Sequence, residues 1–311
     1  MTTVDKNFNQ GYCKNMEGSS KVFIIKAQGV ISPERNVSKD LVYTMMKLGL
    51  NVTAGTANSS ICDLLPNRPT GIKINTIGGL KLSTRPETAL ALAKVLEEEG
   101  VKPNNIIIWD RTNRELKEAG FKLNNDRNHI NVYGTDTSGV GYDRELTSHL
   151  NIGSLFSTIQ SKQISNSISL ALLKDHGLAG ITAGMKNYYG AVHNPNKYHD
   201  FNCDPFVAEL FHTDPVKKKH KLSIIDCLEV QYHRGPSFHP TWLEKSESLI
   251  FGLDPVAVDY VGWQMIERFR EKKGVPSLKE ETREPSYLKT AEKLGLGYSD
   301  PEKIEIIEKE I

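Results

Sequence analysis

The sequence predicts an α/β protein with a mostly parallel sheet, helices on both of its faces and a Rossmann-like arrangement in one large domain. Short apolar runs alternate along the chain with segments whose apolar residues recur at helical spacing, which is typical of βαβ crossovers. Several apolar runs also stop abruptly at a charged residue, as strands do at the binding edge of an open sheet. The 311 residues suffice for one large core, and neither a repeat nor a linker requires a second domain.

Seven apolar runs are expected to be strands, because each is short and apolar enough to be buried in a sheet. They occupy residues 22–25, 71–75, 106–109, 130–133, 168–173, 222–225 and 249–251. The run from 71 to 75 alternates, so that Lys73 and Asn75 face one side of the sheet and two isoleucines face the other.

Helices are expected where capping residues precede apolar residues at helical spacing. Ser38 or Asn36 is the expected N-cap of the first helix, which ends at Gly49. Thr84 and Glu87 have the spacing of a capping box and are expected to begin the second helix.

Three further features predict helices later in the chain. A short helix is expected to begin at Arg111, directly after the third strand. An apolar segment led by Gly177 has helical spacing and is expected to follow the strand that ends at Leu173. Asp204 and Asp254 each precede a proline, which predicts a helix with the aspartate at the N-cap and the proline at N1.

The composition predicts three segments and limits the partners. Residues 1–20 are polar and expected to be flexible, 21–275 form the α/β domain, and 276–311 form a charged C-terminal extension packed on it. The net charge of +1 gives no reason to expect a nucleic acid or membrane-surface partner. No apolar run reaches the roughly 18 residues of a membrane helix, and residues 1–20 lack the apolar core of a secretory signal.

Polar side chains follow several of the expected strands. The richest stretch, residues 170–199, combines glycines with titratable side chains. Because the carboxyl ends of parallel strands share one edge, the polar groups are expected to meet there. The candidates with catalytic roles are Lys174, His176, Lys186, Asn187 and Asp226, and those that bind substrate are Lys73, Asn75 and Asp110. Lys73 or Lys174 would hold a carboxylate or phosphate, and His176 would move a proton near neutral pH.

Simpler interpretations remain open for several of these residues. Asp110 has the position of an N-cap for the next helix, and Asp254 is more typical of a cap than of a catalyst. Lys186 and Asn187 fit the C-terminus of a helix, where the dipole favours a cation. The glycine-containing loop over residues 134–141 has no phosphate-binding motif and resembles an ordinary surface loop.

Seven of the nine histidines lie between residues 176 and 239, which raises the possibility of a metal site. His176, His193 and His199, with a carboxylate, are candidate ligands for one divalent metal. Their spacing matches no zinc motif, so histidines that are surface-exposed or satisfied by other partners are the alternative. His212 and His220 are expected to be surface residues, as is His239.

The four cysteines, Cys13, Cys62, Cys203 and Cys227, are far apart in the sequence. They form no CxxC pair, so no iron–sulfur cluster is expected.

Six motifs, taken in order, resemble the DUF362 family, a domain of unknown function. They are GIKIN at 71–75, WDR at 109–111, KDH at 174–176 with TAGMKNYYG at 182–190, ID at 225–226, GP at 235–236 and DPVAVD at 254–259. The resemblance covers about residues 70–265 and implies functional roles for a set of residues already named: Lys73, Asn75, Lys174, His176, Lys186, Asn187 and Asp226. It also implies that Asp259 binds substrate. Many relatives carry ferredoxin-type cysteines or an export signal. This chain resembles the cluster-free branch, whose relatives are exported, and the resemblance therefore implies an exported mature form. The alternative is a cytoplasmic protein.

The resemblance implies a fold and a set of positions rather than a reaction. At the level of fold the chain also resembles lactate-racemase-type enzymes, in which lysine and histidine act with a nickel cofactor. The leading hypothesis is an enzyme that acts on a small anionic substrate by Lys/His acid–base chemistry, with one divalent metal as an optional cofactor. The alternatives are a non-catalytic metal- or ligand-binding module and a subunit of a larger redox complex. The absence of cluster cysteines argues against the redox version, and nothing in the sequence fixes the oligomeric state.

Overall fold

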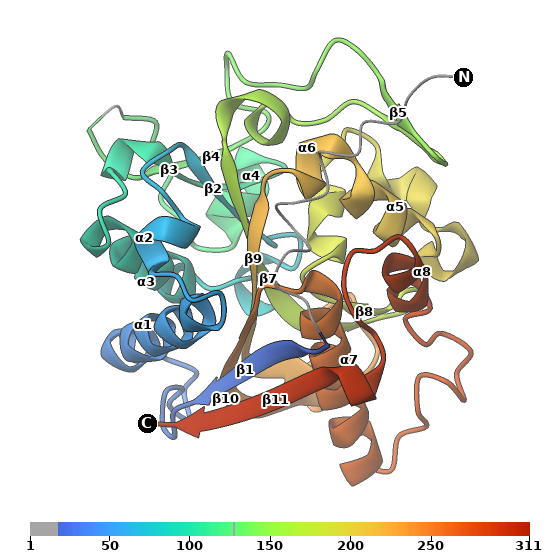
Figure 1. Ribbon diagram of the computed structural model, residues 1–311. Helices are drawn as coiled ribbons and strands as arrows, with labels where there is room; N and C mark the ends of the chain where they lie inside the picture. The colour runs from blue at the N-terminus through green and yellow to red at the C-terminus, as the bar shows by residue number, and fades with distance from the viewer. Residues whose placement is uncertain (1–17, 127) are drawn as a thin grey trace.

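A mixed sheet of nine strands forms the centre of the fold in the computed structural model, which describes residues 18–126 and 128–311 (Figure 1). The strands are β1 (Ser20–Lys26), β2 (Thr70–Ile74), β3 (Ile106–Asp110), β4 (Asn131–Gly134), β7 (Asn166–His176), β8 (Gly180–Thr182), β9 (His220–Gln231), β10 (Leu243–Gly252) and β11 (Ile304–Glu310). Their order is β11-β1-β10-β9-β7-β2-β3-β4, and β8 pairs with β7. β5 (Thr147–His149) and β6 (Ile152–Ser154) form a separate hairpin. The predicted α/β fold with a mostly parallel sheet is confirmed.

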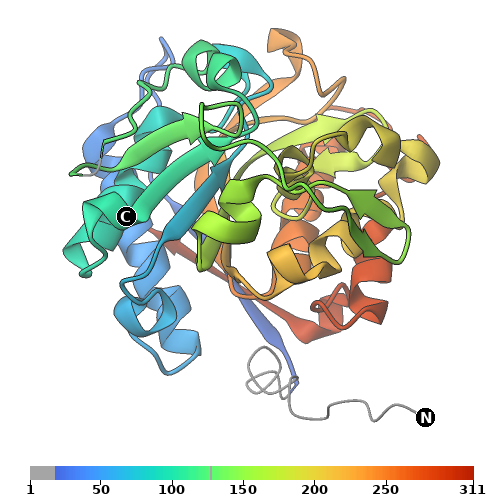
Figure 2. The ribbon, with the colours of Figure 1, turned by 90° about the horizontal axis from the view of Figure 1, so that it is seen from above.

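Helices cover both faces of the sheet, blue to teal on one side and yellow to red on the other (Figures 1 and 2). One face packs against α1 (Lys39–Thr56), α2 (Ile61–Leu64), α3 (Pro86–Glu98) and α4 (Asn113–Glu118). The other face packs against α5 (Phe206–His212), α6 (Asp214–Lys217), α7 (Pro255–Lys272) and α8 (Tyr287–Lys293). Short helices of other types are η1 (Gly79–Lys81), η2 (Pro103–Asn105), η3 (Ile159–Gln163), η4 (Lys186–Ala191), η5 (Pro195–Tyr198), η6 (Asp200–Cys203), η7 (Pro240–Trp242) and η8 (Pro301–Lys303).

Strand alternation divides the buried apolar side chains between two cores. In β1, Val22 and Ile24 enter the core under α7, whereas Phe23 and Ile25 enter the core under α1 and α3. This follows from the two-residue period of a strand, which sends successive side chains to opposite faces. The two cores therefore flank the sheet whose strand ends carry the candidate site.

The first helix is longer than predicted. Ser38 is its N-cap, as expected, and accepts a hydrogen bond from the backbone N–H of Leu41. The helix does not end at Gly49 but continues to Thr56. Gly49 lies inside the helix against the ring of Phe251, so the glycine permits close packing on the sheet rather than a helix end.

The predicted capping box at the second helix is wrong. The N-cap of α3 is Arg85, which makes no side-chain capping bond, and Pro86 is the first helical residue. The Thr84 hydroxyl instead donates to the carbonyl of Leu170 and accepts from the N–H of Asn75. Thr84 therefore joins the end of β2 to the middle of β7, and these tertiary hydrogen bonds replace the predicted capping bond.

The helix predicted after Gly177 is also wrong. Strand β7 continues through His176, turns, and pairs antiparallel with β8. Ala179 and Ile181 are buried in this hairpin. The prediction failed because a short apolar segment fits a strand as well as a helix. Lys186 consequently begins the short helix η4 instead of ending a long one.

Of the two Asp-Pro sequences, only the second behaves as predicted. Asp254 caps α7 by accepting from the N–H groups of Val256 and Ala257. Asp204 is not a cap, because Pro205 itself is the N-cap residue of α5.

The C-terminal segment is part of the sheet as well as packed on the domain. Strand β11 pairs in parallel with β1 along its whole length, and α8 packs against α7 and α5. The expected flexible segment falls largely on residues 1–17, which lie outside the described residues, and Ser20 already begins β1. No helix in the part of the chain that the structure describes is long and apolar enough to cross a bilayer.

Candidate active site

A cavity of about 520 Å³ opens where β2, β3 and β7 end. Eight of the predicted site residues line it: Lys73, Asn75, Asp110, Lys174, His176, Lys186, Asn187 and His199. They meet because β2 runs parallel to both β3 and β7, so the three strands end at the same edge. The sequence did not point to several other lining residues, among them Tyr189 and Phe238.

Lys73 is buried and uses all three of its ammonium hydrogens within the protein. Its Nζ donates to the carbonyl of Ile74 at 2.6 Å, to Asp110 at 2.6 Å and to the side chain of Asn187 at 3.2 Å. The other oxygen of Asp110 accepts from the N–H and the hydroxyl of Thr76. Asp110 is therefore a partner of Lys73 and not the cap of α4, a role that Thr112 fills.

Asn187 fixes the base of the cavity. Its amide nitrogen donates to the carbonyl of Lys73 at 2.7 Å and to the hydroxyl of Ser169 at 3.0 Å. Its oxygen accepts from the Lys73 ammonium, so the side chain ties η4 to both β2 and β7. These bonds position neighbouring groups and leave Asn187 little capacity to bind a substrate.

Lys174 is buried and has only neutral partners. Its Nζ donates to the side-chain oxygen of Asn75 at 3.3 Å and to the carbonyl of Leu82 at 3.2 Å. The pKa of Lys174 is lowered from 10.5 to about 8, mainly by burial and also by the nearby Lys186 ammonium, while the Asp110 carboxylate opposes the shift. One of its three N–H groups is left for a ligand.

Lys186 is the second buried lysine of the cavity, with 7% of its surface exposed. Its Nζ lies 3.2 Å from Nε2 of His199 and 4.2 Å from the centre of the Tyr189 ring. Burial lowers the pKa of Lys186 to about 8. Among the described residues, neither Lys186 nor Lys174 forms an ion pair with a carboxylate.

His176 is held in one neutral form. Its Nδ1 accepts from the N–H groups of Leu178 and Ala179, so the ring proton resides on Nε2. Burial, followed by the charge of Lys186, lowers the pKa of His176 to about 2. The expectation that His176 exchanges a proton near neutral pH is therefore wrong. The sequence does not reveal that this side chain is buried close to the charge of Lys186.

His199 presents its basic nitrogen to Lys186. Its Nδ1 lies 3.2 Å from the carbonyl of Pro195 and donates to it, which leaves the lone pair on Nε2. The His199 ring also stacks on that of His176, with centroids 5.6 Å apart. Burial lowers the pKa of His199, and the Lys186 charge adds to this effect.

The charges that line the cavity do not balance. Lys73 pairs with Asp110, and Arg111 pairs with Glu115 at 2.9 Å. Within the part of the chain that the structure describes, Lys174 and Lys186 remain as two positive charges without an ion-paired carboxylate. Arg111 also lines the cavity. The sequence could have indicated this, because Arg111 directly follows the predicted site residue Asp110.

Asp226 does not reach the cavity. Strand β9 continues to Gln231, so Asp226 lies in mid-strand and not at a strand end. Its carboxylate accepts from Arg85 at 3.0 Å and from Thr88 at 2.9 Å, both at the start of α3. The structure therefore places Asp226 in a buried ion pair and not among the candidate catalytic groups.

Asp259 lies behind the cavity, on α7. Its carboxylate accepts from the N–H groups of Gly184 at 2.7 Å and Met185 at 3.1 Å, and from the hydroxyl of Tyr287 at 3.2 Å. Asp259 therefore holds the turn that immediately precedes Lys186. Burial raises its pKa from 3.8 to about 7.

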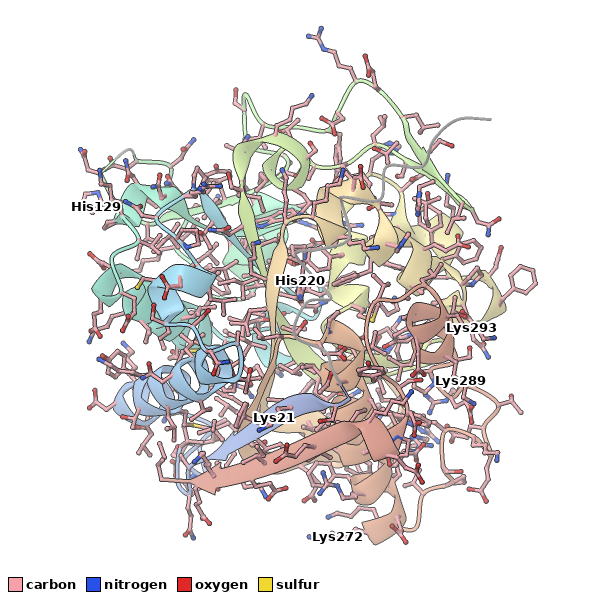
Figure 3. All side chains as sticks on the ribbon, viewed as in Figure 1. Lys21, His129, His220, Lys272, Lys289 and Lys293 are labelled. Carbon is pink, nitrogen blue, oxygen red and sulfur yellow. The ribbon has the colours of Figure 1, made fainter. Side chains whose placement is uncertain are left out.

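The three histidines expected to bind a metal are not assembled. His193 is exposed, packs against the ring of Tyr142 and does not line the cavity that holds His176 and His199. Within residues 18–126 and 128–311, no three or more His, Cys, Asp or Glu side chains are grouped to hold a metal ion. His220 is not a surface residue as predicted but is fully buried, and it is labelled in the middle of the view in Figure 3.

The cysteines outside residues 1–17 are free thiols. Cys62 is exposed, and Cys203 and Cys227 are buried. Cys13 lies outside the described residues.

The C-terminal extension supports the cavity from behind. Arg283 donates to Asp175 at 2.6 Å and to the carbonyl of His176 at 3.1 Å. The other oxygen of Asp175 accepts from the N–H of Gly235, in the loop that brings Phe238 to the cavity. One buried carboxylate thus joins the end of β7, a lining loop and the C-terminal extension.

Two solved structures are similar to this chain at low identity. One is a protein from Thermotoga maritima solved by the Northeast Structural Genomics Consortium, with a TM-score of 0.43 and 11% identity over 76% of this chain and 59% of that one. The other is the lactate racemase apoprotein from Thermoanaerobacterium thermosaccharolyticum, with a TM-score of 0.45 and 13% identity over 83% of this chain and 58% of that one. This chain thus spans less than two thirds of either protein. No curated protein matches it.

A family model matches residues 70–264, a region that contains β2, β3, β7, β9 and every residue of the cavity described above. That match covers more than half of the 311 residues. The chain therefore belongs to the DUF362 family, described as a domain of unknown function.

Proposed function

We propose that this protein is an enzyme that acts on a small anionic substrate by Lys/His acid–base chemistry. One observation carries the proposal: two buried lysine side chains, Lys174 and Lys186, share a cavity and have no carboxylate partner among the described residues. A buried charge without a partner costs several kcal/mol. An anionic ligand that pairs with both lysines would remove this cost, so the cavity is expected to bind an anion.

Lys174 is the proposed anion-binding group. Its two neutral acceptors, Asn75 and Leu82, fix the direction of the ammonium and leave its charge uncompensated. The third N–H then binds a carboxylate or phosphate oxygen as a charge-assisted hydrogen bond. Lys73 is not assigned this role, because its hydrogens are already used.

Lys186 and His199 are the proposed proton-transfer pair. A pKa of about 8 for Lys186 is close to the pH at which most enzymes work, which is the condition for efficient acid–base catalysis. The Nε2 atom of His199 accepts a hydrogen bond from Lys186, so it is the proposed acceptor of the proton that Lys186 releases. His176 is proposed to donate its Nε2 hydrogen to a developing negative charge, as a neutral imidazole does when its pKa is low.

Ligand binding is tested by thermal shift with small carboxylates and phosphate esters, since a compound that binds the native form raises the melting temperature. At least one anion is expected to stabilise the wild type and the Lys117→Met control, in which an exposed lysine of α4 is replaced. Lys174→Met is expected to lose this stabilisation. If no anion stabilises the wild type, or if Lys174→Met responds fully, the proposal is rejected.

Turnover is tested by exchange of the stabilising ligand's C–H hydrogens with deuterated solvent, followed by NMR. The wild type is expected to catalyse this exchange, and Lys186→Met is expected to abolish it while binding persists. Binding without exchange in the wild type would instead identify the non-catalytic ligand-binding module.

A further inference from the structure

The three lysines of the cavity differ in the number of hydrogen bonds that their Nζ atoms donate within the protein. Lys73 donates three, which uses all its ammonium hydrogens. Lys174 donates two, both to neutral oxygens. Lys186 has one polar contact, with a nitrogen atom of His199. A nucleophilic amine needs a free lone pair and a base to remove its proton, and Lys186 meets these conditions best.

The surroundings of Lys186 favour its amine form. Lys186 is buried, with 7% of its surface exposed, and another cation, Lys174, lines the same cavity. A lysine that is desolvated and close to a second cation is activated in the same way in known amine catalysis. The nucleophile and its base, His199, are separated by 3.2 Å, within the range expected for such a pair.

The remaining groups of the cavity define which carbonyl compound fits. The free N–H of Lys174 binds a carboxylate, and the Nε2 hydrogen of His176 is available to a carbonyl oxygen. A 2-oxo carboxylate carries these two groups on adjacent carbons. Ile77, Pro236 and Phe238 add an apolar wall, which suits an apolar substituent on the third carbon.

We propose that Lys186 is a nucleophile that forms an imine with a small 2-oxo carboxylate, an assignment that rests on the proposed function of this cavity. The Lys186 amine attacks the carbonyl carbon, and the electron pair of the C=O bond moves to oxygen. One proton passes from nitrogen to His199 and then to that oxygen, which gives a carbinolamine. The second proton of the nitrogen follows the same route to the hydroxyl oxygen. The oxygen leaves as water and a C=N bond forms, so the step consumes one amine and one carbonyl, releases one water and needs no oxidant. The imine draws electrons from the adjacent carbon, which makes its proton easier to remove.

The imine is tested by trapping with cyanoborohydride, which reduces C=N to a stable secondary amine. Wild-type protein is incubated with pyruvate or phenylpyruvate and cyanoborohydride, and the adduct is located by mass spectrometry of the intact chain and of its peptides. We expect one adduct per chain, on Lys186. Lys186→Met should lose it, Lys174→Met should form it more slowly, and Lys117→Met should behave as the wild type.

Mapping in the wild type needs no variant, so the test holds even if Lys186→Met is unstable. An adduct on Lys174, or one spread over surface lysines as in denatured protein, would overturn the assignment. Anions that stabilise the protein through Lys174 without any trapped adduct would overturn the imine and leave the proposed function intact. If no anion binds and no adduct forms, both proposals fail.

Discussion

The amine of Lys186 lies 3.2 Å from Nε2 of His199, and neither side chain forms an ion pair with a carboxylate among the described residues. A nearby carboxylate would stabilise the fold, but it would also hold the lysine in its charged form. The cavity instead lowers the pKa of the Lys186 amine from 10.5 to about 8, at a cost in stability. Sites of this kind are common where function requires a destabilising arrangement.

Replacing the two unpaired lysines is expected to stabilise the protein. At pH 7 both are charged and buried, so Lys174→Met and Lys186→Met should each raise the free energy of unfolding by about 2 kcal/mol. Urea denaturation measures this difference, and Lys117→Met, which changes an exposed lysine, is expected to have no effect. A clear loss of stability in both buried variants would show that these lysines contribute to the fold.

The same two lysines predict how stability changes with pH. Their pKa values are about 8 in the folded protein and 10.5 in the unfolded chain, so between these values the unfolded chain binds more protons. The free energy of unfolding should therefore contain a component that rises from pH 8 to pH 10.5. The difference between the wild type and the double variant Lys174→Met/Lys186→Met should shrink over this range. A constant difference would contradict the lowered pKa values.

The buried pair of Lys73 and Asp110 should behave in the opposite way. Removing one partner leaves the other charge buried, so Asp110→Asn or Lys73→Met should each lower the free energy of unfolding by about 3 kcal/mol. The double variant should be more stable than the sum of the single losses predicts. Strict additivity in this double-mutant cycle, measured by urea denaturation, would show that the two side chains act independently.

Asp259 should make the protein less stable as the pH rises. Its folded pKa of about 7 exceeds the 3.8 of the unfolded chain, so the folded state binds more protons between these values. Burial is the main cause, Asp254 raises the pKa further, and bonds from Gly184, Met185 and Tyr287 oppose the rise. Relative to wild type, Asp259→Asn should therefore gain about 3 kcal/mol of stability between pH 4 and pH 7.

Asp259→Glu is the matched variant, because it keeps the carboxyl group and should keep the sign of the pH dependence. Thermal unfolding at half-unit pH intervals gives both curves. A difference between the wild type and Asp259→Asn that does not change with pH would show that the carboxyl group is ionised throughout.

Arg283 should control the order of the loop over residues 233–238. Arg283→Met leaves Asp175 with weaker partners, because Arg270 lies 3.5 Å away whereas Arg283 lies 2.6 Å away. Backbone amides of this loop should exchange faster with deuterium, and any bound anion should dissociate faster. Arg268→Met, at an exposed position of α7, is the control. Unchanged exchange at residues 233–238 would remove the link between the extension and the cavity.

Much of the site could be predicted because polar residues follow strands that run in the same direction. Lys73, Asp110 and Lys174 were correctly expected at one edge on this ground alone. The prediction for Asp226 is wrong because strand β9 continues beyond this charged residue to Gln231. The carboxylate of Asp226 can lie within the strand because Arg85 pairs with it. The segment after Gly177 was misassigned because its few apolar residues suit a hairpin as well as a helix.

Periodicity and residue type suffice to predict the α/β class, most of the strands, and the set of lysines, histidines and asparagines from which the site is built. What each of these side chains does depends on how the chain folds around it. Lys73 and Lys174 are the same residue type on neighbouring strands, yet one faces a carboxylate and the other faces neutral oxygens. Burial and the identity of the nearest partner set the charge and hydrogen-bonding capacity of each group, and both arise only when segments distant in the chain are packed together.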